Sequence, residues 1–226
     1  MIGVTENLRK IRDLLHSAAI EANRDPAEVR LLAVSKKQSL EKIREAYAAG
    51  QRDFGENFVQ EGVEKIEAMA KDDLTWHFIG HLQSNKTRVV AEYFDWVHTI
   101  DKFKTARRLS DQRPDDLPPL NLCLQVNVDD EESKSGVTPE ALPELAAACR
   151  DLPNIRLRGL MCLPAIRENL DEQRIPFAVL RKLAEKLRTG GVDTDTLSMG
   201  MTADFRAAIL EGATIVRIGT ALFGER

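Results

Sequence analysis

The 226-residue sequence lacks the features that mark membrane, secreted and metal-binding proteins. No apolar run approaches the roughly 18 residues that a membrane-spanning helix needs, and the N-terminal segment has no apolar core or cleavage site of a signal peptide. Cys123, Cys149 and Cys162 are an odd number without C-x-x-C spacing, so neither a disulfide framework nor a zinc site is indicated. We therefore expect a protein of the reducing cytoplasm with no membrane segment and no bound metal.

The sequence also lacks an excess of positive charge. Its 32 lysine and arginine residues stand against 36 aspartate and glutamate residues, which gives a net charge of -4. A general nucleic-acid-binding protein normally has a basic excess, so we expect no nucleic-acid partner. A basic pocket for one phosphate group would not show in this total. There is no P-loop, no G-x-G-x-x-G motif and no Ser-His-Asp order either.

What the sequence does contain is a regular alternation of short apolar runs and amphipathic stretches. A leading helix is predicted over residues 5–23, with Thr5 as its N-cap. The eight predicted strands are Leu31–Ser35, Asp53–Glu56, Thr75–Gly80, Trp96–Ile100, Leu122–Val128, Leu157–Leu163, Thr196–Gly200 and Ile215–Gly219. The predicted helices between them lie near residues 39–49, 58–71, 85–92, 102–112, 139–150, 173–189 and 203–211.

This order predicts a single α/β domain over residues 1–226, a (β/α)8 TIM barrel with an extra N-terminal helix. Strands that alternate with helices imply right-handed crossovers and a parallel sheet, and compact barrels begin at about 200 residues. A doubly wound open sheet is the main alternative, but it usually has fewer strands. The weakest predicted strand is Asp53–Glu56, because it is short and contains glycine and aspartate.

Lys36 is the first candidate for a functional residue. It follows the first predicted strand, at the barrel end where such folds carry their sites, and the strand register turns Lys36 inward and Lys37 outward. A lysine against an apolar strand end can act as a nucleophile toward an aldehyde. A lysine that extends into solvent is the more common case, and Lys37 could equally be the functional one.

Two candidate anion-binding turns follow the last two strands. In LSMGMTADF, Ser198 ends a strand and Thr202 is placed to cap the next helix. A helix N-terminus beside a hydroxyl can bind phosphate, although such a threonine is more often only a cap. In VRIGTALFG, Gly219 and Thr220 form a second turn, with Arg217 inward on the same strand. Paired elements after strands seven and eight are typical of phosphate sites in barrels.

The four histidines give a weaker indication of function. His77 and His81 lie on a strand and its exit rather than on one helical face, so they do not match a metal-binding pair. His81 is a candidate for the pocket wall, whereas His77 is expected to be a sheet or surface residue. His16 and His98 are expected to be structural.

A close resemblance to the pyridoxal phosphate homeostasis protein family is carried by seven motifs, in the family's order from about residue 30 to the C-terminus: LLAVSK, DFGENFVQE, WHFIGHLQSNK, QVNVDDEESKSGV, GLMCL, LSMGMTADF and VRIGTALFGER. The resemblance implies a fold-type III barrel, as in the N-terminal domain of alanine racemase, with pyridoxal 5′-phosphate (PLP) held on Lys36 as a Schiff base. It also implies that Arg217 faces the pyridine nitrogen. The remaining cofactor-binding residues that it implies are Asn57 and His81 in the pocket wall, and Ser198, Thr202, Gly219 and Thr220 at the phosphate.

The resemblance implies a protein of intracellular PLP homeostasis, which buffers or delivers the cofactor without robust catalysis and so without catalytic residues. Arginine cannot accept a proton from the pyridine nitrogen, so the ring would be a poor electron sink, although racemases of this fold also work with an arginine. The alternative is a PLP-dependent amino-acid racemase or decarboxylase, whose class appends a β-rich second domain. Because the chain ends at Arg226, we expect no such domain. A Schiff-base aldolase is a weaker third hypothesis, since its lysine would lie on an unexpected strand.

The expected partners are PLP itself and apo forms of PLP-dependent enzymes, which would accept the cofactor from a monomeric carrier. Lys134, in the ESKSG segment after the fifth strand, could serve as a transient acceptor during transfer. A solvated loop lysine is the more common case at such a position.

Overall fold

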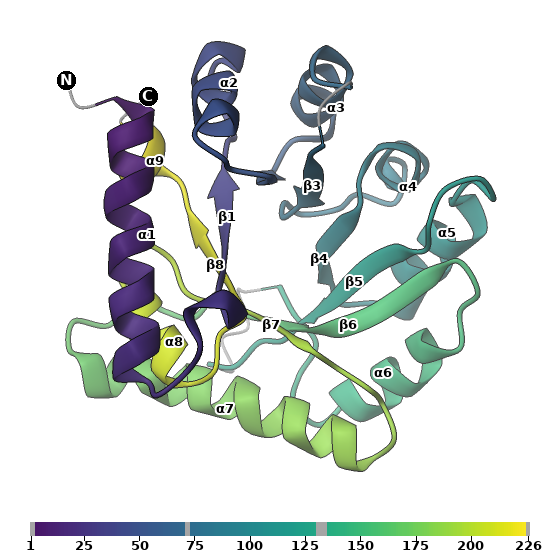
Figure 1. Ribbon diagram of the computed structural model, residues 1–226. Helices are drawn as coiled ribbons and strands as arrows, with labels where there is room; N and C mark the ends of the chain where they lie inside the picture. The colour runs from purple at the N-terminus through teal and green to yellow at the C-terminus, as the bar shows by residue number, and fades with distance from the viewer. Residues whose placement is uncertain (1–2, 71–72, 130–134, 225–226) are drawn as a thin grey trace.

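The computed structural model describes residues 3–70, 73–129 and 135–224. Eight parallel strands form a closed barrel in sequence order, and helices surround it (Figure 1). The barrel is closed by the pairing of the first strand with the last, from Arg30 opposite Ile215 to Ala33 opposite Ile218. The predicted TIM barrel is therefore confirmed, and the open-sheet alternative is wrong.

The bounds of the elements differ from the predicted ones by at most three residues. The strands are β1 Arg30–Val34, β2 Asp53–Glu56, β3 Thr75–Phe78, β4 Trp96–Ile100, β5 Leu120–Gln125, β6 Ile155–Met161, β7 Thr196–Ser198 and β8 Ile215–Ile218. The helices are α1 Val4–Glu21, α2 Leu40–Ala48, α3 Val59–Ala68, α4 Thr87–Tyr93, α5 Phe103–Gln112, α6 Leu142–Arg150, α7 Leu170–Thr189, α8 Phe205–Leu210 and α9 Thr220–Phe223, with a 3-10 helix η1 Pro26–Glu28. Neither η1 nor α9 was predicted. None of the described helices is long and apolar enough to cross a membrane.

Helix α1 precedes the barrel and packs beside α8 and α9 (Figure 1). Its N-cap is Gly3, so the prediction of Thr5 as the cap is wrong. Thr5 lies in the first turn, where its backbone N–H and its hydroxyl donate to the Glu45 carboxylate of α2 at 3.0 and 3.3 Å. Glycine is also tolerated as an N-cap, and the contact with α2 gives the Thr5 backbone N–H a partner outside the helix.

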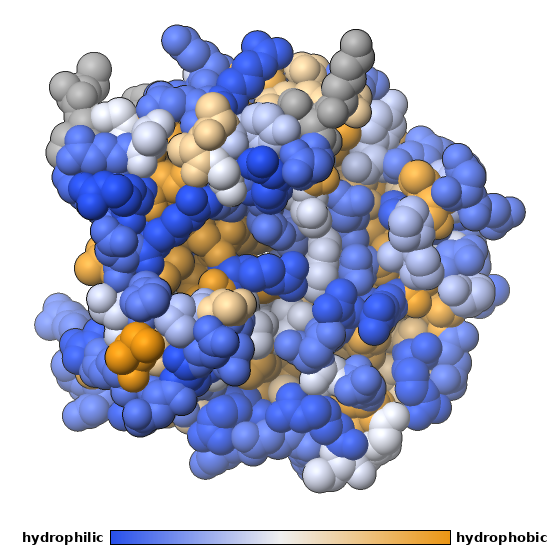
Figure 2. Space-filling view, viewed as in Figure 1, coloured by the Kyte–Doolittle hydropathy of each residue, from blue (hydrophilic) through white to orange (hydrophobic). Residues whose placement is uncertain are grey.

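The side chains inside the barrel differ from those between the barrel and its helices. The outer layer is apolar, and its fully buried members include Phe54, Phe78 and Phe94. Successive strand residues face opposite sides of a sheet, and a small separate cluster of Trp96, Cys123 and Met161 faces inward. Seen from outside, the face in Figure 2 is mostly hydrophilic, with apolar side chains gathered in a hollow near its centre.

Candidate functional site

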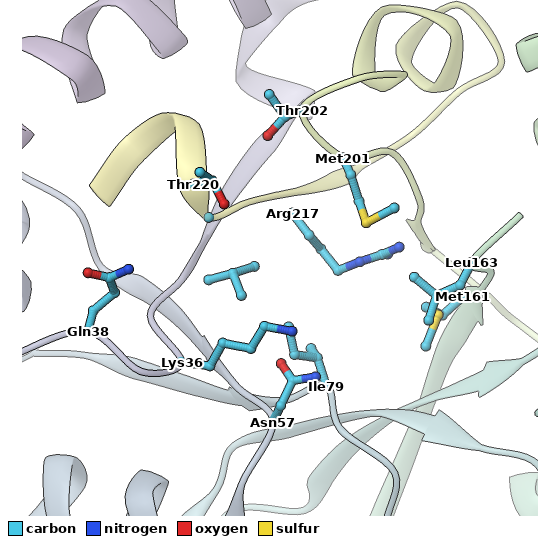
Figure 3. Close-up of a pocket in the computed structure, with 12 residues that line it drawn as sticks. Lys36, Gln38, Asn57, Ile79, Met161, Leu163, Met201, Thr202, Arg217 and Thr220 are labelled. Carbon is cyan, nitrogen blue, oxygen red and sulfur yellow. The ribbon is translucent and has the colours of Figure 1, made fainter. Parts of the chain in front are cut away.

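A cavity of about 370 Å³ lies at the C-terminal ends of the strands. This volume is within the range of roughly 300–1,000 Å³ that is typical of small-molecule sites. Six of the eight predicted site residues line it, and Ser198 and His81 do not. The lining residues are Val34, Lys36, Gln38, Asn57, Ile79, Met161, Leu163, Met201, Thr202, Arg217, Gly219 and Thr220. Figure 3 shows Lys36, Asn57 and Arg217 projecting into this space.

Lys36 is directed into the cavity by the turn that follows β1. The next residue, Lys37, has a φ of 59°, an uncommon left-handed conformation for a residue with a side chain. The Lys37 amine lies 5.8 Å from the centre of the exposed Phe58 ring, and its backbone N–H donates to Glu61. The predicted division between an inward Lys36 and an outward Lys37 is therefore confirmed.

A buried ion pair fixes the backbone immediately before Lys36. Lys65 of α3 donates to the Ser35 carbonyl at 2.7 Å, to the Glu56 carboxylate at 2.8 Å and to Glu61 at 2.6 Å. Ser35 donates its hydroxyl to the same Glu56 oxygen at 2.6 Å. Burial raises the pKa of Glu56, because its effect exceeds the opposing effects of Lys65 and Ser35. This cluster was not predicted, since it depends on the packing of α3 against β1 and β2.

Arg217 carries the positive charge of the cavity wall on β8. Its side chain is almost fully buried, with Nη1 donating to Ser198 Oγ at 2.8 Å and Nη2 donating to the Cys162 carbonyl at 2.9 Å. Burial lowers the pKa of Arg217, but a guanidinium stays charged at any physiological pH. Burial raises the pKa of the nearby Cys162 thiol to about 12, so no thiolate nucleophile is available there.

Ser198 lies behind Arg217 rather than on the cavity surface. It is fully buried, and its Oγ is 2.8 Å from both Arg217 Nη1 and His98 Nδ1. A hydroxyl engaged by these two neighbours is not aimed at a ligand in the cavity. The geometry therefore favours a supporting role for Ser198 over the expected phosphate contact.

Thr202 and Thr220 lie on the side of the cavity next to α9 (Figure 3), and Gly219, which also lines the cavity, is the residue before that helix. The prediction of Thr202 as a helix cap is wrong, because α8 begins at Phe205 with Asp204 as its N-cap. Asp204 accepts from the Met201 N–H at 2.6 Å and closes a turn that leaves Thr202 exposed. A Cβ at position 219 would come within 3.3 Å of the Val34 Cβ and carbonyl oxygen, so a larger residue would require β1 to shift by a few tenths of an ångström.

Asn57 and His81 occupy different surroundings. Asn57 lines the cavity, and its Oδ1 is buried without a hydrogen-bond partner among the described residues. A buried acceptor in this state costs free energy until a donor reaches it. His81 is exposed and lines an adjacent hollow with Asn57 and Phe58. Lys134 lies outside the described residues.

Two histidines that were expected to be structural or peripheral lie inside the barrel. His77 and His98 are fully buried, so His77 is a sheet residue of β3, as one half of the prediction had it, and not a surface residue. His98 shares the inward side of β4 with Trp96, which residue alternation along the strand could have indicated. Their connection to the cavity could not be predicted, because it crosses the barrel between strands that are not neighbours.

The sequence matches the family model for the N-terminal domain of alanine racemase over residues 5–226. It is 56% identical over 226 residues to the pyridoxal phosphate homeostasis protein of Pseudomonas aeruginosa, with 100% of this chain and 97% of that protein covered. The protein of the same name from Escherichia coli K12 is 52% identical over 232 residues, with 100% and 98% covered.

Solved structures with the same barrel include PipY of Synechococcus elongatus with PLP bound, at a TM-score of 0.84 and 37% identity over 98% of this chain and all of PipY. The alanine racemase of Corynebacterium glutamicum aligns with a TM-score of 0.74 at 15% identity, over 99% of this chain and 61% of the racemase chain. The racemase likeness shows a shared fold alone.

Proposed function

The chain belongs to the pyridoxal phosphate homeostasis protein family, and on that premise we propose that it holds PLP in the cavity around Lys36. The protein takes part in PLP homeostasis. We propose further that it works in the cytoplasm as a monomeric buffer or carrier, delivers PLP to apo forms of PLP-dependent enzymes, and has no robust catalytic turnover.

The observation that carries this proposal is a lysine amine and a buried arginine that reach into one cavity of ligand size. The residues fit PLP on chemical grounds. The Asn57 carbonyl oxygen is an acceptor without a described partner, and Thr202 and Thr220 offer hydroxyl groups on the opposite side. When bound, PLP supplies an aldehyde that condenses reversibly with an amine, and a pyridine ring that can accept electrons.

The residues of the cavity then take distinct roles. Lys36 is the nucleophilic amine that tethers the cofactor, and Thr202, Gly219 and Thr220 are placed to hold its phosphate. Ser198 acts through Arg217 rather than on the phosphate. Asn57 contributes an acceptor beside Lys36, whereas His81 lines the adjacent hollow and not the cavity around Lys36.

Arg217 bears on the choice between a carrier and an enzyme. If the pyridine nitrogen of bound PLP faces Arg217, as the family resemblance implies, the guanidinium would donate a hydrogen bond to it but could not accept a proton or hold the ring protonated as a carboxylate does. The site then holds the cofactor without strengthening its electron demand. An arginine in this place is compatible with reversible storage, and since racemases of this fold also work with one, the turnover measurement described below decides between the two functions.

Borohydride reduction of the protein in the presence of PLP, followed by peptide mapping, tests the role of Lys36. We expect the label on the Lys36 peptide, its loss in Lys36→Ala, and its retention in Lys37→Ala, because the neighbouring lysine is directed away from the cavity. Lys37→Ala is the matched control. Label on Lys37 with none on Lys36 would contradict the assignment.

The same proteins, loaded with PLP but not treated with borohydride, distinguish a carrier from an enzyme. We expect conversion of L- to D-alanine no faster than with PLP alone, and transfer of PLP to an apoenzyme that regains activity. Robust amino-acid turnover would contradict the carrier proposal and leave the assignment of Lys36 intact.

A further inference from the structure

Five polar side chains form one hydrogen-bonded chain through the interior of the barrel. Asp53 Oδ1 lies 3.1 Å from His77 Nε2, and His77 Nδ1 lies 2.9 Å from His98 Nε2. His98 Nδ1 lies 2.8 Å from Ser198 Oγ, which accepts from Arg217 Nη1 at 2.8 Å. Each residue comes from a different strand, namely β2, β3, β4, β7 and β8.

The hydrogen-bonded chain connects the two ends of the barrel. Asp53 is the first residue of β2 and lines a second hollow, at the N-terminal ends of β1 and β2, while Arg217 lines the cavity at the other end. The step between His98 and Ser198 crosses the interior, because β4 and β7 are not paired in the sheet. His77, His98 and Ser198 are 0% exposed, so water cannot replace the bonds that join these three residues at low cost.

Burial favours the neutral form of both imidazole rings, and with neutral rings the carboxylate at one end sets one direction on every bond of the hydrogen-bonded chain. Arg217 has only donors, and a carboxylate has only acceptors. Ser198 accepts from Arg217 and donates its hydroxyl to His98 Nδ1. His98 donates its Nε2–H to His77 Nδ1, and His77 donates its Nε2–H to Asp53.

This direction requires both imidazole rings to be neutral with the proton on Nε2. Burial lowers the pKa of His77, although Asp53 opposes the effect. Burial lowers the pKa of His98 further, with contributions from His77, Arg217 and Arg30. An added proton on His77 would place two N–H groups against each other unless His98 changed tautomer, which would release the Ser198 hydroxyl from its acceptor.

We propose that Asp53, His77, His98 and Ser198 are positioning residues, which hold the Arg217 guanidinium at the cavity wall and keep the Ser198 hydroxyl turned away from the cavity. Arginine has a long side chain with many rotamers, and its fixed orientation here depends on two acceptors, Ser198 Oγ and the Cys162 carbonyl. The hydrogen-bonded chain keeps Ser198 Oγ available as an acceptor for Arg217, because Ser198 donates its hydroxyl proton to His98. The identity of the ligand that Arg217 orients rests on the proposed function, whereas the hydrogen-bonded chain of side chains does not depend on it.

The tautomers of the two histidines are measurable in the wild-type protein without added ligand. We expect the imidazole ¹⁵N shifts of His77 and His98 at pH 7.5 to show neutral rings protonated at Nε2. A proton on Nδ1 of either ring would overturn the proposal, and this test needs no variant to fold.

Three variants test the effect on the cavity. Ser198→Ala removes the acceptor of Arg217, and we expect PLP affinity to fall about 3- to 10-fold, as for the loss of one hydrogen bond, with a shift of the visible absorption band of bound PLP. His98→Gln keeps one acceptor and one donor, as the neutral ring does, and should retain more of the wild-type affinity and spectrum than His98→Leu. The exposed His16→Gln is the control.

Wild-type affinity and spectrum in both Ser198→Ala and His98→Leu, with the folded state verified by thermal unfolding, would overturn the positioning role. Failure of the proposed function gives a different result, since the wild-type protein itself would then bind no PLP.

Discussion

At the scale of single residues, the position of the backbone next to Lys36 depends on the ammonium group of Lys65, which is itself almost fully buried. Lys65 is 5% exposed and Glu56 is 0% exposed, so neither charge is well solvated. Such a pair adds little stability over an apolar pair, but removal of one partner leaves an unpaired charge in the interior. The pair therefore fixes geometry more than it stabilises the fold.

Lys65→Met should lower the free energy of unfolding by about 3 kcal/mol at pH 8, as measured by urea denaturation. The loss arises because Glu56, whose pKa is already raised by burial, must then either keep a buried charge without the ammonium group or take up a proton. The double variant Lys65→Met with Glu56→Gln removes both charges and should recover at least half of the loss. Equal losses in the single and double variants would show that the ammonium stabilises the fold by some other contact.

At the scale of elements, the single-turn helix α9 carries Thr220 and is held by helices from the other end of the chain. Asn7 of α1 donates to the Leu222 carbonyl at 3.0 Å, and Lys42 of α2 donates to the Phe223 carbonyl at 2.8 Å. The last carbonyls of a helix have no acceptor role within it, so these side chains act as its cap. The extra N-terminal helix thus supports one wall of the cavity.

Asn7→Ala should lower the free energy of unfolding by about 1 kcal/mol and increase amide hydrogen exchange at Phe223 and Gly224. The same change should weaken PLP binding if Thr220 holds the phosphate. Arg9→Ala is the control, because Arg9 lies on the solvent side of α1 and pairs only with the exposed Asp13 among the described residues. A similar change in exchange in both variants would argue against a specific cap.

The sequence predicted the elements better than it predicted their ends and their contacts across the barrel. Alternation of strand and helix periods identified all eight strands, including the short β2, because each burial pattern is local. Thr5 and Thr202 were assigned as caps on residue preference alone, which does not show that Gly3 and Asp204 take those places. Lys36 was predicted from its position after β1, whereas the partners of Arg217 come from β7 and the segment after β6 and required the closed barrel.

At the scale of the whole molecule, the polar interior makes stability depend on pH. The buried rings of His77 and His98 face Asp53, Asp95, Arg30 and Arg217, and both have a lowered pKa. The unfolded chain therefore binds more protons than the folded chain below the ordinary histidine pKa of 6.5. Stability is then greatest above that pH and decreases as the solution is acidified.

Between pH 7.5 and 5.5, the free energy of unfolding should decrease by up to about 1.4 kcal/mol per pH unit for each buried histidine. Urea denaturation at a series of pH values measures this slope. His98→Gln should reduce the slope by about half, whereas His16→Gln should leave it unchanged. A flat profile in the wild-type protein would show that the two rings titrate normally.

The chain from Asp53 to Arg217 also has a consequence for how the sequence can change over time. Each of the three inner members donates to one neighbour and accepts from the other, while Arg217 only donates and Asp53 only accepts, so the cost of a substitution at one position depends on the residues at the other four. A single replacement leaves a buried group unsatisfied, while a matched pair of replacements need not. We therefore expect these five positions, which are spread over 165 residues of the sequence, to covary among homologues, so that they are conserved or replaced together.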